Sequence, residues 1–227
     1  MKLASLVASL FIATYVAGSS VPDPRKAPTA FEAEWLEQAT KVEKTASQQH
    51  LTIYVLTQSG EGVAGSPANT SFYKRKDGSK LCAITIIAAD NPMADIMFDH
   101  VPWYMRKTAI KTILLHELGH CAQYFHDTTR VLDEAEMKKE AYADVYALAV
   151  LARGSSSEYN SAVAFATMLR TKTSPPPDDP VQRNSYERYD TMRYIEMHRE
   201  IKSLGKKYEP HDVAAHIVYG EPLSEQK

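Results

Sequence analysis

The sequence predicts an α+β fold in which a small mixed sheet is followed by a mostly helical C-terminal part. Alternating β-branched and apolar residues concentrate between residues 51 and 88, and Asp77-Gly78 lies between two such runs, as in a β-hairpin. After residue 102, apolar residues recur instead at the helical spacing of three and four, and glycines and prolines interrupt them. The two patterns together indicate a sheet-containing first half and a helical second half.

The first half of the chain is expected to supply one helix, the strands and a long second helix. Thr29 to Glu32 form a capping box, from which a helix extends to about Ser47. Pro102 opens the long helix, about Trp103 to Phe125. Strands are expected at residues 51–56, 71–76 and 80–88, with a glycine-rich loop at 60–69 and a further short strand at 95–100.

Four more helices are expected after the long one. The first begins at the acidic run Asp133 to Glu136, with Asp133 as its cap, and stops at Gly154. The others are expected at residues 157–170, 184–204 and 211–219, with a stiff proline spacer at 174–177. The pattern suggests an N-terminal lobe of about residues 28–126 and a helical lobe of about residues 127–220.

The pattern His116-Glu117-Leu118-Gly119-His120 in the long helix indicates a metal site. A spacing of four places both imidazoles on one helix face, about 6 Å apart, where they can hold one zinc ion. Glu117 projects beside the metal rather than at it. Its carboxylate is therefore placed as a general base that takes the proton of a zinc-bound water.

A third metal ligand must come from elsewhere, because a catalytic zinc usually has three protein ligands and one open position. Glu140 can supply it from a second helix that folds back on the first, and Asp144 follows Glu140 on the same helix face. A carboxylate at Asp144 would accept the free ring N–H of a ligating histidine and fix its orientation. His116 is the expected partner of Asp144.

HExxH followed by ExxxD resembles the thermolysin-like zinc metallopeptidases, the gluzincins, and the segment EAYADVYALAVL resembles the ExxAD helix that many of them carry. The resemblance implies zinc ligands at His116, His120 and Glu140, a general base at Glu117 and a supporting carboxylate at Asp144. It also implies a zincin-like fold for residues 21–227. The function that follows is zinc-dependent hydrolysis of peptide bonds in a peptide or protein substrate.

His126 is the alternative third ligand. The related metzincin pattern, HExxHxxGxxH, places its last histidine at this position, but Gln123 replaces the glycine at which that chain leaves the helix. The helix is therefore expected to continue past Gln123, which favours Glu140.

The family resemblance implies two further features outside the motif. One is a strand at the edge of the sheet that lines the cleft and pairs with the peptide, a role we assign to Ile84 to Ala89. The other is a histidine or tyrosine that donates a hydrogen bond to the oxyanion of the transition state. The candidates for this donor are Tyr142, Tyr186, Tyr189, Tyr194, His198, His211 and His216.

The two cysteines leave two interpretations open. A disulfide between Cys82 and Cys121 would tie the second hairpin strand to the motif helix just after His120. Alternatively, both are buried apolar thiols.

The first twenty residues have the anatomy of a secretory signal peptide, since one lysine precedes an apolar run that ends in small residues at Gly18 to Ser20. This pattern predicts a secreted or periplasmic protein with no stable membrane anchor after cleavage. The net charge of −2 gives no basis for binding nucleic acid. Two other classes stay open, namely a non-catalytic zinc-binding protein of the cell envelope and an amidase that acts on cell-wall peptides.

Overall fold

The computed structural model describes residues 30–58, 66–88, 91–173 and 190–224. The expected signal peptide at residues 1–20 and the proline spacer at 174–177 lie outside these ranges. None of the described helices combines the length and the hydrophobicity needed to cross a bilayer.

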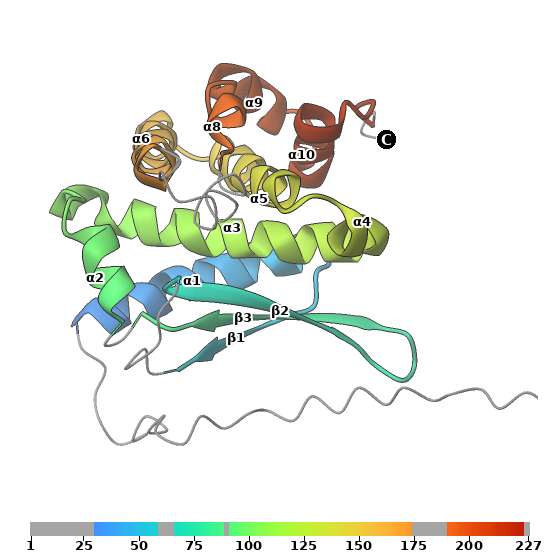
Figure 1. The fold of residues 1–227 in the computed structure, drawn as a ribbon, viewed down its shortest axis with the longest axis horizontal. Helices are drawn as coiled ribbons and strands as arrows, with labels where there is room; N and C mark the ends of the chain where they lie inside the picture. The colour runs from blue at the N-terminus through green and yellow to red at the C-terminus, as the bar shows by residue number, and fades with distance from the viewer. Residues whose placement is uncertain (1–29, 59–65, 89–90, 174–189, 225–227) are drawn as a thin grey trace, which may run out of the picture.

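The elements form three layers, and the predicted α+β class is confirmed (Figure 1). A three-stranded sheet of β1 (Ile53–Thr57), β2 (Ala68–Lys74) and β3 (Lys80–Ile86) makes the first layer. Helices α1 (Ala30–Gln48) and α3 (Arg106–His126) cover one face of it. The third layer lies beyond α3 and holds α5 (Glu136–Leu151), α6 (Ser156–Thr173), α8 (Met192–Ile195), α9 (His198–Gly205) and α10 (Pro210–Tyr219).

The sheet is mixed, with the strand order β1-β3-β2. The hairpin at Asp77-Gly78 is confirmed, because β2 and β3 pair antiparallel and Asp77 accepts hydrogen bonds from the main chain and hydroxyl of Ser79. β1 pairs with β3 in parallel, from Ile53 opposite Cys82 onward. The prediction that residues 84–89 form the edge strand of the cleft is therefore wrong: β3 is the central strand, and β2 is the edge strand that packs on α3.

Two other predicted elements differ from the structure. Residues 95–100 are not a strand, because helix α2 (Pro92–Phe98) occupies this segment and Pro92 and the Asn91 side chain suit a helix start. The single helix expected at 184–204 is, in its described part, divided into α8 and α9.

The chain between the two motif helices also differs from the prediction. It leaves α3 at Asp127, whose side chain accepts the N–H of Arg130 and caps a short helix, α4 (Thr128–Asp133). Asp133 therefore ends α4 and is not the cap of α5. The N-cap residue of α5 is Ala135, which makes no capping bond with its side chain.

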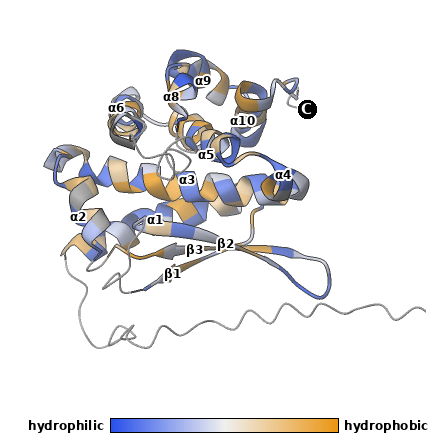
Figure 2. Cartoon of the chain, in the orientation of Figure 1, coloured by the Kyte–Doolittle hydropathy of each residue, from blue (hydrophilic) through white to orange (hydrophobic). Residues whose placement is uncertain are grey.

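The apolar core gathers around α3 and α5, which run through the centre of the molecule (Figure 2). Ile84 of β3, Leu115 and Leu118 of α3 and Val145 of α5 are completely buried there. Cys82 and Cys121 form a disulfide, with their Cα atoms 5.7 Å apart, so the first of the two interpretations holds. The bond joins the central strand to the motif helix.

Gly119 sets the separation of α3 and α5. A Cβ atom built on Gly119 would lie 2.8 Å from the Cα of Ala143 and 3.2 Å from the Cβ of Tyr146. Real Cβ atoms do not approach a backbone so closely, so only glycine allows the two helices to pack at this distance.

We expect Gly119→Ala to destabilise the fold by about 1–3 kcal/mol, because the added methyl group forces α5 away from α3. Helix propensity alone would favour alanine by about 1 kcal/mol, so the sign of the change tests the close packing. Urea unfolding followed by circular dichroism measures it. Gly154→Ala is the control, since its Cβ would meet only the flexible Glu158 side chain at 3.0 Å and a carbonyl oxygen at 3.4 Å. A gain in stability for Gly119→Ala would contradict the prediction.

Candidate metal centre

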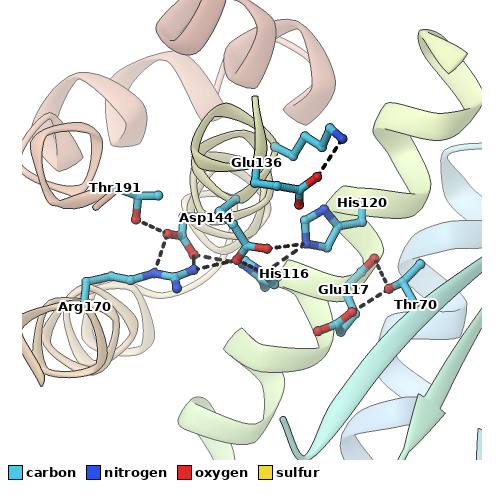
Figure 3. A network of polar contacts seen from close by, with 10 residues as sticks. Thr70, His116, Glu117, His120, Glu136, Asp144, Arg170 and Thr191 are labelled. Carbon is cyan, nitrogen blue, oxygen red and sulfur yellow. Dashed lines mark hydrogen bonds and ion pairs between the residues drawn. The ribbon is translucent and has the colours of Figure 1, made fainter. Parts of the chain in front are cut away.

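Helices α3 and α5 bring three potential metal ligands together. His116 and His120 project from α3 (Figure 3). Glu140, the third of them, belongs to α5. One ligand atom from each of them lies within 4.8 Å of the others. Their side chains are almost completely buried, with 11–16% of their surface exposed.

The separations suit a single ion. The two Nε2 atoms of His116 and His120 are 3.2 Å apart, and Glu140 oxygens lie 3.4 Å and 3.7 Å from them. Donor atoms about 2.1 Å from one metal ion at tetrahedral angles lie about 3.4 Å from each other. His116, His120 and Glu140 therefore form a group that could hold a metal ion, and the structure identifies no particular metal.

Asp144 lies behind His116, one helical turn after Glu140. The Nδ1 of His116 donates to Oδ1 of Asp144 over 2.8 Å. Because a carboxylate can only accept this bond, Nδ1 carries a proton and Nε2 is the ring nitrogen that faces His120 and Glu140.

Arg170 of α6 completes the buried network, and the sequence analysis did not single it out. Its guanidinium donates to both oxygens of Asp144 over 2.8 Å, and it lies 3.4 Å from Oε2 of Glu140. Thr191 donates a further 2.6 Å bond to Asp144. Burial would raise the pKa of Asp144, but the adjacent guanidinium and the His116 bond outweigh it and hold that pKa below its usual range.

One signal in the sequence could have identified Arg170. It follows Ala166 by one helical turn, on a face of α6 that also carries buried Phe165 and Ala162. A charged residue on an apolar helix face is almost always paired when it is buried.

Glu117 lies beside the ligand group and not within it. It is 7% exposed, and Oε2 accepts a 2.5 Å hydrogen bond from the hydroxyl of Thr70 on β2. Its side chain therefore faces the sheet, whereas the imidazoles of the same helix face α5 (Figure 3).

The buried groups have displaced pKa values. Burial opposes a charge on His116, but hydrogen bonds to Asp144 and Glu140 outweigh it and raise the pKa of His116 to about 10. Burial, and then the charge of His116, lower the pKa of His120 to about 4. Burial also opposes the charge of Glu140, but its bond to His116 prevails and lowers the pKa of Glu140 to about 2. Burial raises the pKa of Glu117 to about 7.

His126 does not join the group. Helix α3 continues through Gln123 to His126, as expected from the missing glycine, and the His126 ring stacks on His211 with centroids 3.7 Å apart. Gln123 donates to the hydroxyl of Tyr219 of α10.

A cavity of about 670 Å³ opens over the ligand group between β2 and helices α3, α5 and α6. Its polar lining includes Glu117 and all three potential ligands. Its apolar lining includes Met97, Ile113, Phe165, Ala166 and Leu169. The lining also includes Phe72, Gln123, Val131, Glu136 and Lys139.

None of the described candidates for the oxyanion donor lines this cavity. Tyr142 packs against Tyr146 and Tyr219, His211 against His126, and the remaining described candidates Tyr194, His198 and His216 make contacts elsewhere. Tyr186 and Tyr189 lie outside the described residues.

Comparison with family models, curated proteins and solved structures finds no match to this chain. The ligand group, the carboxylate beside it and the cavity are therefore the observations that bear on function.

We expect Arg170→Met to cost the metal-free protein about 3–5 kcal/mol of unfolding free energy, because it leaves two buried carboxylates without their guanidinium. A bound dication would offset the same carboxylates, so added zinc should stabilise the variant more than it stabilises the wild type. Urea unfolding of both proteins with and without zinc measures the two gains. Arg199→Met, at an exposed position of α9, is the control. Equal gains in wild type and Arg170→Met would contradict the expectation.

Proposed function

We propose that this protein is an exported zinc-dependent metallopeptidase related to the gluzincins, with a zincin-like fold. The observation that carries the proposal is the convergence of His116, His120 and Glu140 from two helices, with the buried carboxylate of Glu117 beside them. Export rests on the signal-peptide pattern of residues 1–20 alone.

Zinc is the metal that suits this donor set best. Two imidazole nitrogens and one carboxylate oxygen are the ligands of many catalytic zinc ions, and three protein ligands leave a fourth position open. When bound, zinc would supply Lewis acidity that makes a water molecule nucleophilic near neutral pH. The hydrogen bond that His116 Nδ1 donates to Asp144 leaves Nε2 as the nitrogen available for a metal ion.

Glu117 serves as the general base of the proposed reaction. It lines the cavity next to the ligand group, so its carboxylate can take a proton from the attacking water and pass it to the nitrogen of the leaving amine. Burial favours this exchange, because it destabilises the ionised form and brings the pKa of Glu117 to about 7.

The cavity supports a peptide as the substrate. Residues Ala68 to Thr70 and Phe72 of the edge strand β2 line one side of it, where an extended peptide could add as a further strand. The apolar lining residues Met97 and Phe165 would contact a large apolar side chain of that peptide.

Glu117→Gln should lower the rate of peptide hydrolysis by about 10²–10⁴-fold while zinc remains bound, since the amide cannot take up the proton. Cleavage of a mixed peptide library and zinc content by atomic absorption measure the two effects. Glu136→Gln is the matched control, because Glu136 is a more exposed carboxylate of the same cavity. Equal rates for wild type and Glu117→Gln would reject the base. Tight zinc binding without cleavage by the wild type would instead favour a zinc-binding protein that is not a peptidase.

Glu140→Ala should release zinc, whereas His126→Ala should retain it, because only the first removes a member of the ligand group. Equilibrium dialysis against zinc measures both variants. If Glu140→Ala keeps its zinc and His126→Ala loses it, the third ligand is His126 and not Glu140.

Ala166→Leu should narrow the cavity at its apolar lining and reduce kcat/KM for peptides with phenylalanine beside the cleaved bond by about 10-fold or more. Peptides with alanine at the same position should be cleaved as by the wild type. Val163→Leu adds a carbon to α6 at a position outside the cavity lining and is the control. An equal loss of kcat/KM for both peptides would contradict the assignment of this apolar lining to a substrate side chain.

A further inference from the structure

Thr70 connects the sheet to the carboxylate of Glu117. It lies on β2 opposite Ile84 of β3, and it lines the cavity. Its hydroxyl oxygen is 2.5 Å from Oε2 of Glu117 and 3.2 Å from the main-chain oxygen of the same residue. These residues are 47 positions apart, so the contact depends on the packing of the edge strand against α3 (Figure 3).

The hydroxyl of Thr70 has two acceptors within hydrogen-bond distance, both of them oxygens of Glu117. A hydroxyl carries one proton and two lone pairs, so it donates to one oxygen at a time and can accept in addition. While Glu117 is ionised, Thr70 donates to the carboxylate. The contact with Oε2 is the shorter of the two, so the hydroxyl proton of Thr70 points to the carboxylate rather than to the main-chain oxygen.

We propose that Thr70 is the positioning residue of the general base. Its hydroxyl fixes the orientation of the Glu117 carboxylate, which lines the cavity. The inference rests on the proposed peptidase function and adds a residue that the motif does not contain. It also ties the base on α3 to the strand that borders the proposed substrate site, because Thr70 belongs to β2 itself.

Three variants separate the hydroxyl from the rest of the side chain. Thr70→Val removes the hydroxyl and keeps the shape, whereas Thr70→Ser keeps the hydroxyl and removes the methyl group. Thr85→Val is the matched control: it makes the same change in the neighbouring strand, where Thr85 pairs with Asn69 and is not part of the cavity lining.

The test measures kcat and KM on a peptide that the wild type cleaves, together with zinc content. Thr70→Val should lower kcat by about 10- to 100-fold, with KM and zinc content unchanged, because only the orientation of the base is lost. Thr70→Ser and Thr85→Val should stay within about threefold of the wild type. Wild-type kcat in Thr70→Val overturns the proposal. So does a loss in Thr70→Ser as large as in Thr70→Val, since the methyl group would then be responsible.

Crystal structures of the zinc-loaded wild type, Thr70→Val and Thr85→Val provide a readout that does not depend on activity. The Glu117 carboxylate should move or lose its single position in Thr70→Val alone. An unmoved carboxylate in that variant overturns the proposal. If the wild type cleaves no peptide, the proposed function fails, while the crystallographic comparison still decides whether Thr70 positions Glu117.

Discussion

The contact between α3 and α5 at Gly119 is the constraint on which the site depends. Gly119 directly precedes His120 and lies on the α3 surface that meets Ala143 of α5. Ala143 lies between the two carboxylates of α5, so the helices approach most closely where imidazoles and carboxylates must meet. His116 Nε2 and Glu140 are already 3.4 Å apart, which is about the separation of two ligands of one ion. A wider helix separation would move them out of this range. The ligand group therefore depends on the small residues Gly119 and Ala143 as well as on the potential ligands themselves.

The same close packing buries negative charge, which a cation on α6 compensates. Two carboxylates on one face of α5 are buried, and burial of unpaired charge is strongly unfavourable. Arg170 compensates the negative charge, because it donates two hydrogen bonds to Asp144 and lies close to Glu140. Thr191 donates one more hydrogen bond to Asp144. The acidic half of the site is therefore compensated by the protein itself. Because these donors come from two other parts of the helical layer, the orientation of Asp144 depends on how that layer packs.

The sequence predicted what local periodicity determines and missed what long-range packing determines. The shared face of His116 and His120 follows from their spacing, and the position of Glu140 follows from a second helix folding back. The order of the strands does not follow from such patterns. The apolar run at 80–88 shows that a strand is buried, and full burial of Ile84 is typical of a central strand, yet family analogy placed it at the edge. Thr70 and Arg170 were missed because neither belongs to the HExxH or ExxxD pattern, and no spacing in the sequence connects them to Glu117 and Asp144.

The polar side chains of the motif in helix α3 point toward two different layers of the fold. Successive residues of an α-helix are rotated by about 100°, so Glu117 cannot face the same neighbour as His116. The imidazoles face α5, which supplies the third potential ligand, and Glu117 faces β2, which supplies Thr70 (Figure 3). The cavity between the sheet and the helices is lined by both groups of side chains, so it is the space in which they come together. The disulfide from Cys121 to the central strand fixes α3 on the sheet side, and Gly119 fixes it on the helical side. The position of Glu117 relative to the three potential ligands is therefore set by both layers, although only Glu140 lies outside this turn of α3.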